Sequence, residues 1–515
     1  MLAAWPVLLE QPVLSVAVFL PIVGAVVLAA IPKGREDVLK AWALLVSLAT
    51  AAVGVYLLGA FDYGDAGRLQ FVVDTKWIPV INSRYHVGID GISLPLLVLS
   101  MVITVLCVVY SWDHFPEPHN PKAFLILMLL LETGMNGTFA AEDLILFFVF
   151  FELVLLPMYF MIGVWGGPNR QYAAIKFFLY TLFGSALMIL SFLALYFKGG
   201  QTFDIPLLIA QGGTIGHSTQ VLIFAGLFMG FAIKVPMFPF HTWLPDAHTE
   251  APTVGSVILA AVLLKLGAYG FIRIAIPILP DAAMTWAPWI GLLAVIGIIY
   301  GALGCLAQKD MKRLIAFSSV SHMGFVMLGI ATLTTFGINA AVFGMVAHGL
   351  ITGMLFFIAG SVQERFKTRE LSRLGGLLLQ APRLGWVLGF CVFASLGLPG
   401  LAGFWGEFPA ILASYQPAQG LQLWVFRTYM AVASVGTVFA AGYLLWMLQR
   451  VAFGTAKSEF EQSHIHDIHI PEYLAWTPLL LGIVALGVFP NLLFHVTDKA
   501  VTVVTSGVTQ LASAR

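Results

Sequence analysis

The sequence contains few charges and few cysteines for its length. Only 10% of its 515 residues are charged, and the 26 basic residues equal the 26 acidic residues in number. This balance excludes the strongly basic surface of a nucleic-acid-binding protein. The three cysteines (Cys107, Cys305 and Cys391) lie far apart in apolar stretches, which argues against a disulfide framework or a thiolate-bound metal.

Motifs for cofactors and for export are also missing. The chain has no GxGxxG, Walker A or CxxC motif, so a nucleotide or redox centre must belong to another chain. No Lys or Arg precedes Lys33, so Leu14–Ile31 lacks the basic region of a cleaved signal peptide. We therefore expect this stretch to be the first membrane span and to remain in the mature protein.

Apolar residues make up 59% of the chain, more than a water-soluble fold can hide from solvent. A membrane helix needs roughly 20 apolar residues, so about fourteen spans would use most of the length. The sequence predicts an all-α polytopic membrane protein, with a small hairpin at most in the longest connection, Phe61–Gly88. The predicted spans are 13–31, 38–60, 89–112, 122–140, 142–163, 172–197, 218–240, 251–276, 285–307, 312–333, 338–362, 384–413, 426–452 and 473–497.

Lys and Arg residues predict the orientation of these spans. The loops after odd-numbered spans carry 16 basic residues, whereas the loops after even-numbered spans and the C-terminus carry 8. Basic loops stay on the cytoplasmic side of a membrane. We therefore expect both termini on the opposite, periplasmic side.

Five of the charged residues fall within apolar runs, and a charge at the bilayer centre costs at least ~2.5–3.5 kcal/mol. They are Glu132, Glu152, Lys234, Lys265 and Glu407. Opposite charges in separate spans usually pair and mark ion pathways, which predicts a Glu152–Lys234 pair. Lys265 is too deep in its apolar run to reach the interface. Glu132 adjoins the glycine-rich residues 134–137. For this residue, a buried hydrogen-bonding acid and a member of an ion pathway are equally supported.

Helix breakers adjoin two of these charges. Lys234 precedes Pro236 and Pro239, and Glu407 lies between the Leu398–Gly400 turn and Pro409. The two breaks are five spans apart, so equivalent helices would run in opposite directions, as in the inverted repeats of transporters. The prediction is one repeat over spans 4–8 (122–276) and one over spans 9–13 (277–452), flanked by residues 1–121 and 453–515.

Two histidines extend the row of buried ionisable groups. His322 corresponds by span order to Glu152, and His348 lies in the next span. A buried histidine is often only a satisfied core residue, but imidazole can pass protons near neutral pH. In a row with two glutamates and two lysines, both are predicted to be relay residues. A zinc site at His464, His466 and His469 is the functional alternative to a plain polar loop there.

Several long stretches resemble one family, the antiporter-like proton-channel subunits of respiratory complex I and of multisubunit cation/proton antiporters. The resemblance covers nearly the whole chain, and within the family it is greatest to the chain 4, or subunit M, branch of proton-translocating NADH–quinone oxidoreductase. The stretches are Phe231–Pro252, Leu264–Phe271, Gln308–Phe325, Phe150–Tyr159 and Gly403–Phe408. Sister subunits and the antiporters typically have lysine where this chain has Glu407.

The resemblance implies a role for each charge. Glu152 and Lys234 would be a coupled pair, Lys265 the central relay and Glu407 the exit-side acid; His322 and His348 also match relay positions. It implies that quinone reduction elsewhere in the complex drives proton movement here. NADH, FMN, iron–sulfur clusters and quinone would be bound by partner subunits, and none by this chain. Other membrane-arm and peripheral-arm subunits, the lipid bilayer and H⁺ would be its partners.

Three functions therefore remain open from the sequence. The chain is a complex I pump subunit, or a subunit of a multisubunit cation/proton antiporter, or a structural spacer whose buried charges only fix helix packing. As a pump subunit it would act as part of an H⁺-translocating enzyme without a redox centre of its own. The basic loops and the lack of a transit peptide favour a bacterial inner membrane.

Overall fold

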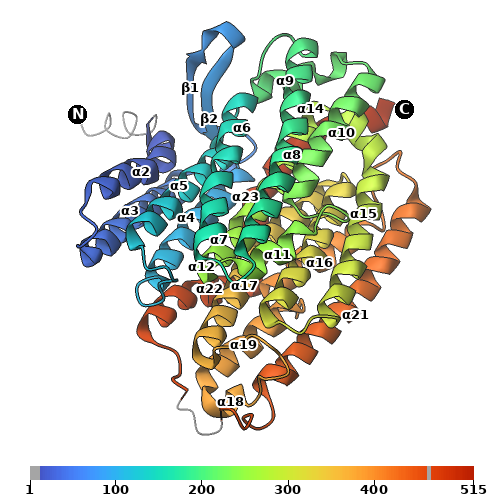
Figure 1. The fold of residues 1–515 in the computed structure, drawn as a ribbon. Helices are drawn as coiled ribbons and strands as arrows, with labels where there is room; N and C mark the ends of the chain where they lie inside the picture. The colour runs from blue at the N-terminus through green and yellow to red at the C-terminus, as the bar shows by residue number, and fades with distance from the viewer. Residues whose placement is uncertain (1–11, 461–464, 515) are drawn as a thin grey trace.

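The computed structural model describes residues 12–460 and 465–514. Within them, thirteen helices are long and apolar enough to cross a membrane. They form one bundle (Figure 1). The continuous spans are α2 (Val13–Ala30), α3 (Glu36–Ala60), α4 (Ser93–Tyr110), α5 (Pro121–Ala140), α8 (Arg170–Lys198), α10 (His217–Lys234), α15 (Pro280–Leu306), α16 (Met311–Ala331), α17 (Thr335–Phe366), α21 (Leu423–Ala452) and α22 (Ile470–Val488).

The remaining spans are interrupted. The fifth consists of α6 (Leu144–Leu153) and α7 (Leu155–Trp165), and the eighth of α12 (Thr253–Ile258), the π-helix η4 (Leu259–Leu263), α13 (Leu264–Gly270), the π-helix η5 (Phe271–Ala275) and α14 (Ile276–Ile278). The predicted twelfth span is split into α19 (Pro382–Ser395) and α20 (Ala402–Ala413), each too short to cross alone. With this split span, the predicted fourteen are accounted for.

Both predicted helix breaks are confirmed. The helix α10 ends at Lys234, and the short helix α11 (Trp243–Glu250) resumes after the prolines. The α19–α20 break falls at the Leu398–Gly400 turn, whereas Pro409 lies inside α20 without ending it. The remaining short helices are α9 (Ile205–Gln211), α18 (Leu377–Gln380) and the 3₁₀ turns η1 (Tyr63–Asp65), η2 (Pro79–Ile81) and η3 (Gly212–Thr214).

The predicted end of the last span, residue 497, is wrong. Helix α22 ends at Val488, and Phe489–Pro490 separates it from a second helix, α23 (Asn491–Ala514). Val496, Val504 and Val508 recur at helical spacing on α23, and the last two are buried. This is the pattern of a one-sided helix that packs on the bundle surface. Lys499 on α23 donates to the Gly64 carbonyl over 2.5 Å, so α23 reaches the connection after α3.

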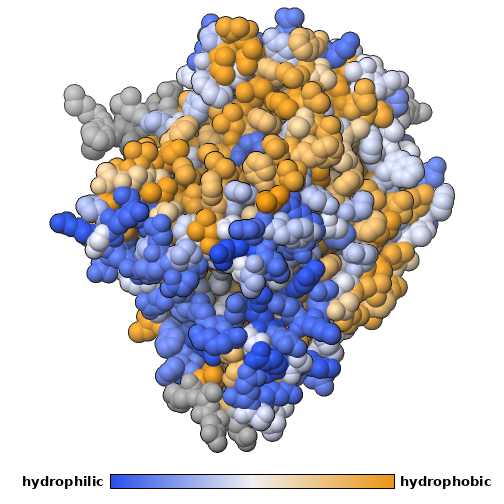
Figure 2. Space-filling view, in the orientation of Figure 1, coloured by the Kyte–Doolittle hydropathy of each residue, from blue (hydrophilic) through white to orange (hydrophobic). Residues whose placement is uncertain are grey.

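Three spans form the centre of the bundle and the others surround it. The most apolar 18 residues of the eighth span and of α17 are entirely buried, and those of α16 are 94% buried, whereas only 33–39% are buried in α3, α8 and α22. The outer helices expose apolar side chains; Figure 2 shows a broad apolar surface, with hydrophilic residues gathered toward the end that carries α18. The central helices have no lipid-facing side, so any polar group on them must find a partner inside the protein.

The predicted hairpin is present in the Phe61–Gly88 connection. Strands β1 (Gln70–Ile78) and β2 (Ser83–Ile89) pair antiparallel and project from the bundle at the end opposite α18 (Figure 1). A polar cluster holds their base: Asp143 caps α6 and accepts from Ser83 Oγ over 3.0 Å, and Arg273 pairs with Asp90 over 2.5 Å. The Glu142–Asp143 turn predicted between spans 4 and 5 therefore also anchors the hairpin.

Glu142 is buried in this cluster between the fourth and fifth spans. Burial raises its pKa from 4.5 to about 7, while Arg273, 3.7 Å away, opposes the rise. Asp90 and Asp204 also raise the pKa, and His86 lowers it. A group with these neighbours changes charge close to neutral pH.

We predict that Glu142 makes the stability of the protein depend on pH. Its folded-state pKa is raised, so the folded state keeps the proton that the unfolded state releases, and stability falls as pH rises from 4.5 to 7. The loss is on the order of 3 kcal/mol. Thermal unfolding at pH 5 and pH 7.5 should show a smaller decrease in Tm for Glu142→Gln than for the wild type. An equal decrease in both would contradict the prediction.

We also predict the orientation of the bundle from accessible surface positions. Ser506 on α23 and Ser372 in the basic loop after α17 are both exposed, and the three native cysteines are buried. In intact cells, an impermeant thiol reagent should label Ser506→Cys. It should label Ser372→Cys only in inverted vesicles. Labelling of both from one face would show that the span count is wrong.

Candidate functional site

Lys265 is the most deeply buried ionisable residue of the predicted row. It lies on α13 with no exposed surface, and its Nζ donates to the Ala260 carbonyl and contacts His348 Nδ1 at 2.7 Å. Ala260 belongs to the π-helix η4, whose wider turn changes the backbone hydrogen bonding and turns this carbonyl toward the lysine. The eighth span thus supplies both the cation and one of its two hydrogen-bond acceptors.

The Lys265–His348 contact couples the protonation of the two side chains. Nδ1 accepts a hydrogen bond from the ammonium only when it carries no proton itself. If the proton crosses to Nδ1, the lysine becomes a neutral amine and the histidine an imidazolium. The contact therefore has two forms that differ by the position of one proton, which is the arrangement a relay requires.

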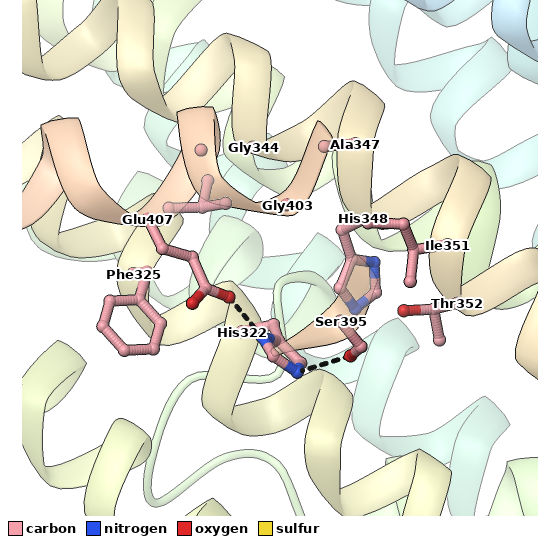
Figure 3. A pocket seen from close by; sticks show the side chains of 12 residues that line it. His322, Phe325, Gly344, Ala347, His348, Ile351, Thr352, Ser395, Gly403 and Glu407 are labelled. Carbon is pink, nitrogen blue, oxygen red and sulfur yellow. Dashed lines mark hydrogen bonds and ion pairs between the residues drawn. The ribbon is translucent and has the colours of Figure 1, made fainter. Parts of the chain in front are cut away.

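His322 and Glu407 continue the row from His348. The rings of His348 and His322 are 6.1 Å apart, and His322 Nδ1 hydrogen-bonds Glu407 Oε1. Figure 3 shows His322, His348, Ser395 and Glu407 around one cavity, whose volume of about 20 Å³ holds one water molecule. Water in this cavity would connect the two histidines.

Two further side chains hold the His322 ring. Its Nε2 lies 3.2 Å from Ser395 Oγ and 3.1 Å from the Tyr443 hydroxyl. The sequence analysis missed both residues, because a serine and a tyrosine in an apolar span carry no distinctive pattern. Since hydroxyls both donate and accept, they can hold the ring in either protonation state.

A close helix contact sets the position of Glu407. A Cβ atom on Gly406 would lie only 2.5 Å from the Gly344 Cα, so α20 and α17 approach backbone to backbone at two glycines. The neighbouring Glu407 extends from this contact to His322, and its side chain remains 13% exposed. Its outer side faces a groove between the α19–α20 break and α21, lined in part by Ser434 and Thr437.

Glu152 and Lys234 lie near each other but do not form an ion pair. Glu152, on α6, accepts from Ser185 on α8. Lys234 Nζ is buried without a hydrogen-bond partner and lies 4.7 Å from the centre of the Phe151 ring. The two charges are close enough to interact electrostatically. The predicted Glu152–Lys234 ion pair is therefore not formed in this structure, and Lys234 instead makes a cation–π contact with Phe151.

Glu132 and the loop histidines lie outside this row. Glu132 is fully buried on α5, and neither of its oxygens has a hydrogen-bond partner. His464 lies outside the described residues, while the rings of His466 and His469 are 5.9 Å apart. In the part of the chain that the structure describes, no three His, Cys, Asp or Glu side chains are grouped to hold a metal.

Comparison with known proteins identifies the family. Residues 141–447 match the family described as NADH:quinone oxidoreductase/Mrp antiporter, TM, and residues 69–138 match NADH-ubiquinone oxidoreductase chain 4, amino terminus. The chain belongs to this antiporter-like family. The resemblance found in the sequence is thereby confirmed, as is the all-helical membrane fold.

Relatives of the family match over nearly the full length. NADH-quinone oxidoreductase subunit M of Rickettsia prowazekii is 39% identical over 96% of this chain and 99% of its own. Respiratory complex I from Thermus thermophilus contains a chain with a TM-score of 0.85 and 29% identity, covering 96% of this chain and 99% of that one. The Mrp complex from Dietzia sp. shares the fold, with a TM-score of 0.83 at 20% identity over 98% and 99% of the two chains.

Membership in the antiporter-like family establishes the class of the protein. It is an antiporter-like, proton-translocating membrane subunit of the NADH–quinone oxidoreductase type, and the enzyme is the complex to which it belongs. Its partners are other subunits of that complex.

We predict that Glu407 acts through its acid group. Glu407→Gln keeps the size of the side chain but cannot carry a proton, so NADH-driven proton uptake in inverted vesicles should fall severalfold. Glu407→Asp keeps the acid and should retain most of the uptake. Equal loss in both variants would instead indicate that side-chain length and packing at the α19–α20 break matter most.

Proposed function

We propose that this subunit carries protons along a buried row formed by Glu152, Lys234, Lys265, His348, His322 and Glu407. The observation that carries the proposal is the part of the row from Lys265 to Glu407, where hydrogen bonds join Lys265 to His348 and His322 to Glu407 and the two histidine rings lie 6.1 Å apart. There, proton-carrying groups from α13, α17, α16 and α20 meet at the most buried part of the bundle. Buried ionisable groups in membrane helices are costly, and they face one another when they form an ion pathway.

The burial of the side chains along the row supports proton movement along the membrane plane. Lys234, Lys265, His322 and His348 are buried, whereas the two glutamates at the ends of the row are partly exposed. A charge change at one surface can thus act on Glu152, and Glu407 can pass a proton outward at the other end. In this proposal Glu152 and Lys234 receive the signal, Lys265 and the histidines transfer the proton, and Glu407 releases it.

The separated Glu152–Lys234 pair represents one of two states. When the carboxylate pairs with the ammonium, Lys234 keeps its proton; when they separate, burial disfavours the charged lysine and the proton leaves toward Lys265. Moving one proton against 100 mV requires ~2.3 kcal/mol. Loss of a buried charge partner is worth several kcal/mol, so this change is large enough to drive the step.

The proposal also includes the repeats that hold the row, the membrane and the cofactors of partner subunits. The two broken spans lie five spans apart, as two inverted repeats at 122–276 and 277–452 require, with 1–121 and 453–515 flanking them. The basic loops support a bacterial inner membrane with both termini in the periplasm. NADH, FMN, iron–sulfur clusters and quinone belong to partner subunits in this proposal, and electron transfer there supplies the energy.

The proposal is tested at the Glu152–Lys234 pair. Lys234→Ala and Glu152→Gln should each reduce quinone-dependent proton uptake in inverted vesicles, because each removes a proton-carrying group. The double variant should assemble on native gels and remain inactive. In a structural spacer, by contrast, removing both charges would relieve the penalty of one uncompensated charge and restore uptake.

A matched control is available in Glu132. It is a buried glutamate of the same bundle but has no hydrogen-bond partner and no place in the row. Glu132→Gln should therefore assemble and pump as the wild type does. Recovered pumping in the Glu152–Lys234 double variant would contradict the relay and leave only a structural ion pair.

A further inference from the structure

A groove on the outer surface of the bundle separates helices α19 and α22. Both helices pack against α17, and both begin at the end of the bundle that carries α18 (Figure 1). The groove between them has a volume of about 390 Å³, which is within the range of ligand pockets. Its walls include Val387 and Phe390 on α19, and Thr477, Leu480 and Val484 on α22.

The groove is apolar and open to the surroundings of the bundle. Apart from the Thr477 hydroxyl and the indole N–H of Trp386, its walls consist of hydrocarbon side chains. Trp386 is 72% exposed and Leu481 is 63% exposed, so the groove faces outward from the core. Water in such a place would find too few hydrogen-bond partners. A hydrocarbon chain is therefore the occupant that the walls favour.

A cationic side chain lies at one end of this groove. Arg383 is exposed and lies one helical turn before Trp386, on the same face of α19. Its Nη1 donates to the Tyr473 hydroxyl on α22 over 3.2 Å, so the two side chains meet across the end of the groove. Unlike Arg365, which pairs with Glu472, Arg383 forms no ion pair in the part of the chain that the structure describes.

The surroundings of Arg383 place this end of the groove at the membrane interface. Trp and Tyr side chains gather at that level, and an arginine there extends its charge toward water. Asp467 accepts from the backbone N–H groups of Arg383 and Leu384 over 3.0 Å each, so it caps α19. From Tyr473 the groove runs about 16 Å along α22 to Val484, at 1.5 Å per residue. A charge at the interface is thus followed by an apolar path into the membrane.

We propose that this groove binds one anionic phospholipid, with its phosphate at Arg383 and Tyr473 and one acyl chain between α19 and α22. A guanidinium presents paired N–H donors that match the oxygens of a phosphate. The Tyr473 hydroxyl accepts from Arg383 and can donate its own proton to the phosphate. The net negative charge of the lipid complements the unpaired arginine, as anionic lipids attract basic residues at the membrane surface.

Photoactivatable lipids test the proposal on the assembled complex. The purified complex, depleted of lipid in detergent, is incubated with phosphatidylglycerol or phosphatidylcholine that carries a diazirine in one acyl chain. After irradiation, mass spectrometry identifies the labelled peptides of this subunit. Phosphatidylglycerol should label α19 and α22 about fivefold more than phosphatidylcholine does, which is the factor expected of one basic side chain near an anionic lipid. Arg383→Gln should remove this preference.

Two further variants separate the headgroup from the acyl chain. Arg450 lies in the last turn of α21, over the Trp446 ring at 5.2 Å and outside the groove, so Arg450→Gln should keep the preference for phosphatidylglycerol. Thr477→Phe fills the groove from an exposed position without changing its charge, and it should reduce labelling by both lipids. Arg383, Arg450 and Thr477 are all exposed, so each variant should assemble on native gels.

Two results would overturn the proposal. Equal labelling by the two lipids, unchanged in Arg383→Gln, would show that the groove holds only the ordinary lipid around a membrane protein. No labelling of α19 and α22 by either lipid in the wild-type complex would show that another subunit covers the groove. The proton row is tested separately, because none of its residues lines this groove.

Discussion

The hydrogen bond between Lys265 and His348 is the contact on which the rest of the site depends. It joins the eighth span to α17 at the centre of the bundle, where the helices are buried on all sides. A lysine cation in such a place is tolerated only if the protein supplies acceptors. The Ala260 carbonyl in the π-helix η4 and the His348 ring on α17 are those acceptors.

The same contact explains why the row crosses the bundle instead of following one helix. Three of the ionisable groups are bonded by a side chain from a different helix: Lys265 by His348, His322 by Glu407, and Glu152 by Ser185. These bonds link the spans in the membrane plane. Lys234 is the exception, because it rests against Phe151 and not against a hydrogen-bond acceptor.

Much of this arrangement follows from the sequence alone. Apolar length predicted the spans, prolines beside Lys234 and Leu398–Gly400 predicted the broken helices, and out-of-place charges predicted the residues of the row. The π-helices of the eighth span were not predictable, since a π-helix has no sequence pattern that distinguishes it from an α-helix. The separate helix α23 was predictable in part: Pro490 breaks the apolar run, and the valines after it recur at helical spacing.

Helix α23 also affects how the chain completes its fold. Lys499 on this helix contacts the connection after the second span, and Asp498 and Thr497 bond to Asn339 on α17. At Gly91 a Cβ atom would lie 1.9 Å from the Val496 carbonyl oxygen, so the two segments meet backbone to backbone. Contacts between such distant parts of a chain form late. A chain without α23 would therefore keep its spans, but the backbone around Gly64 and Gly91, on either side of the hairpin, would lose the helix that packs on it.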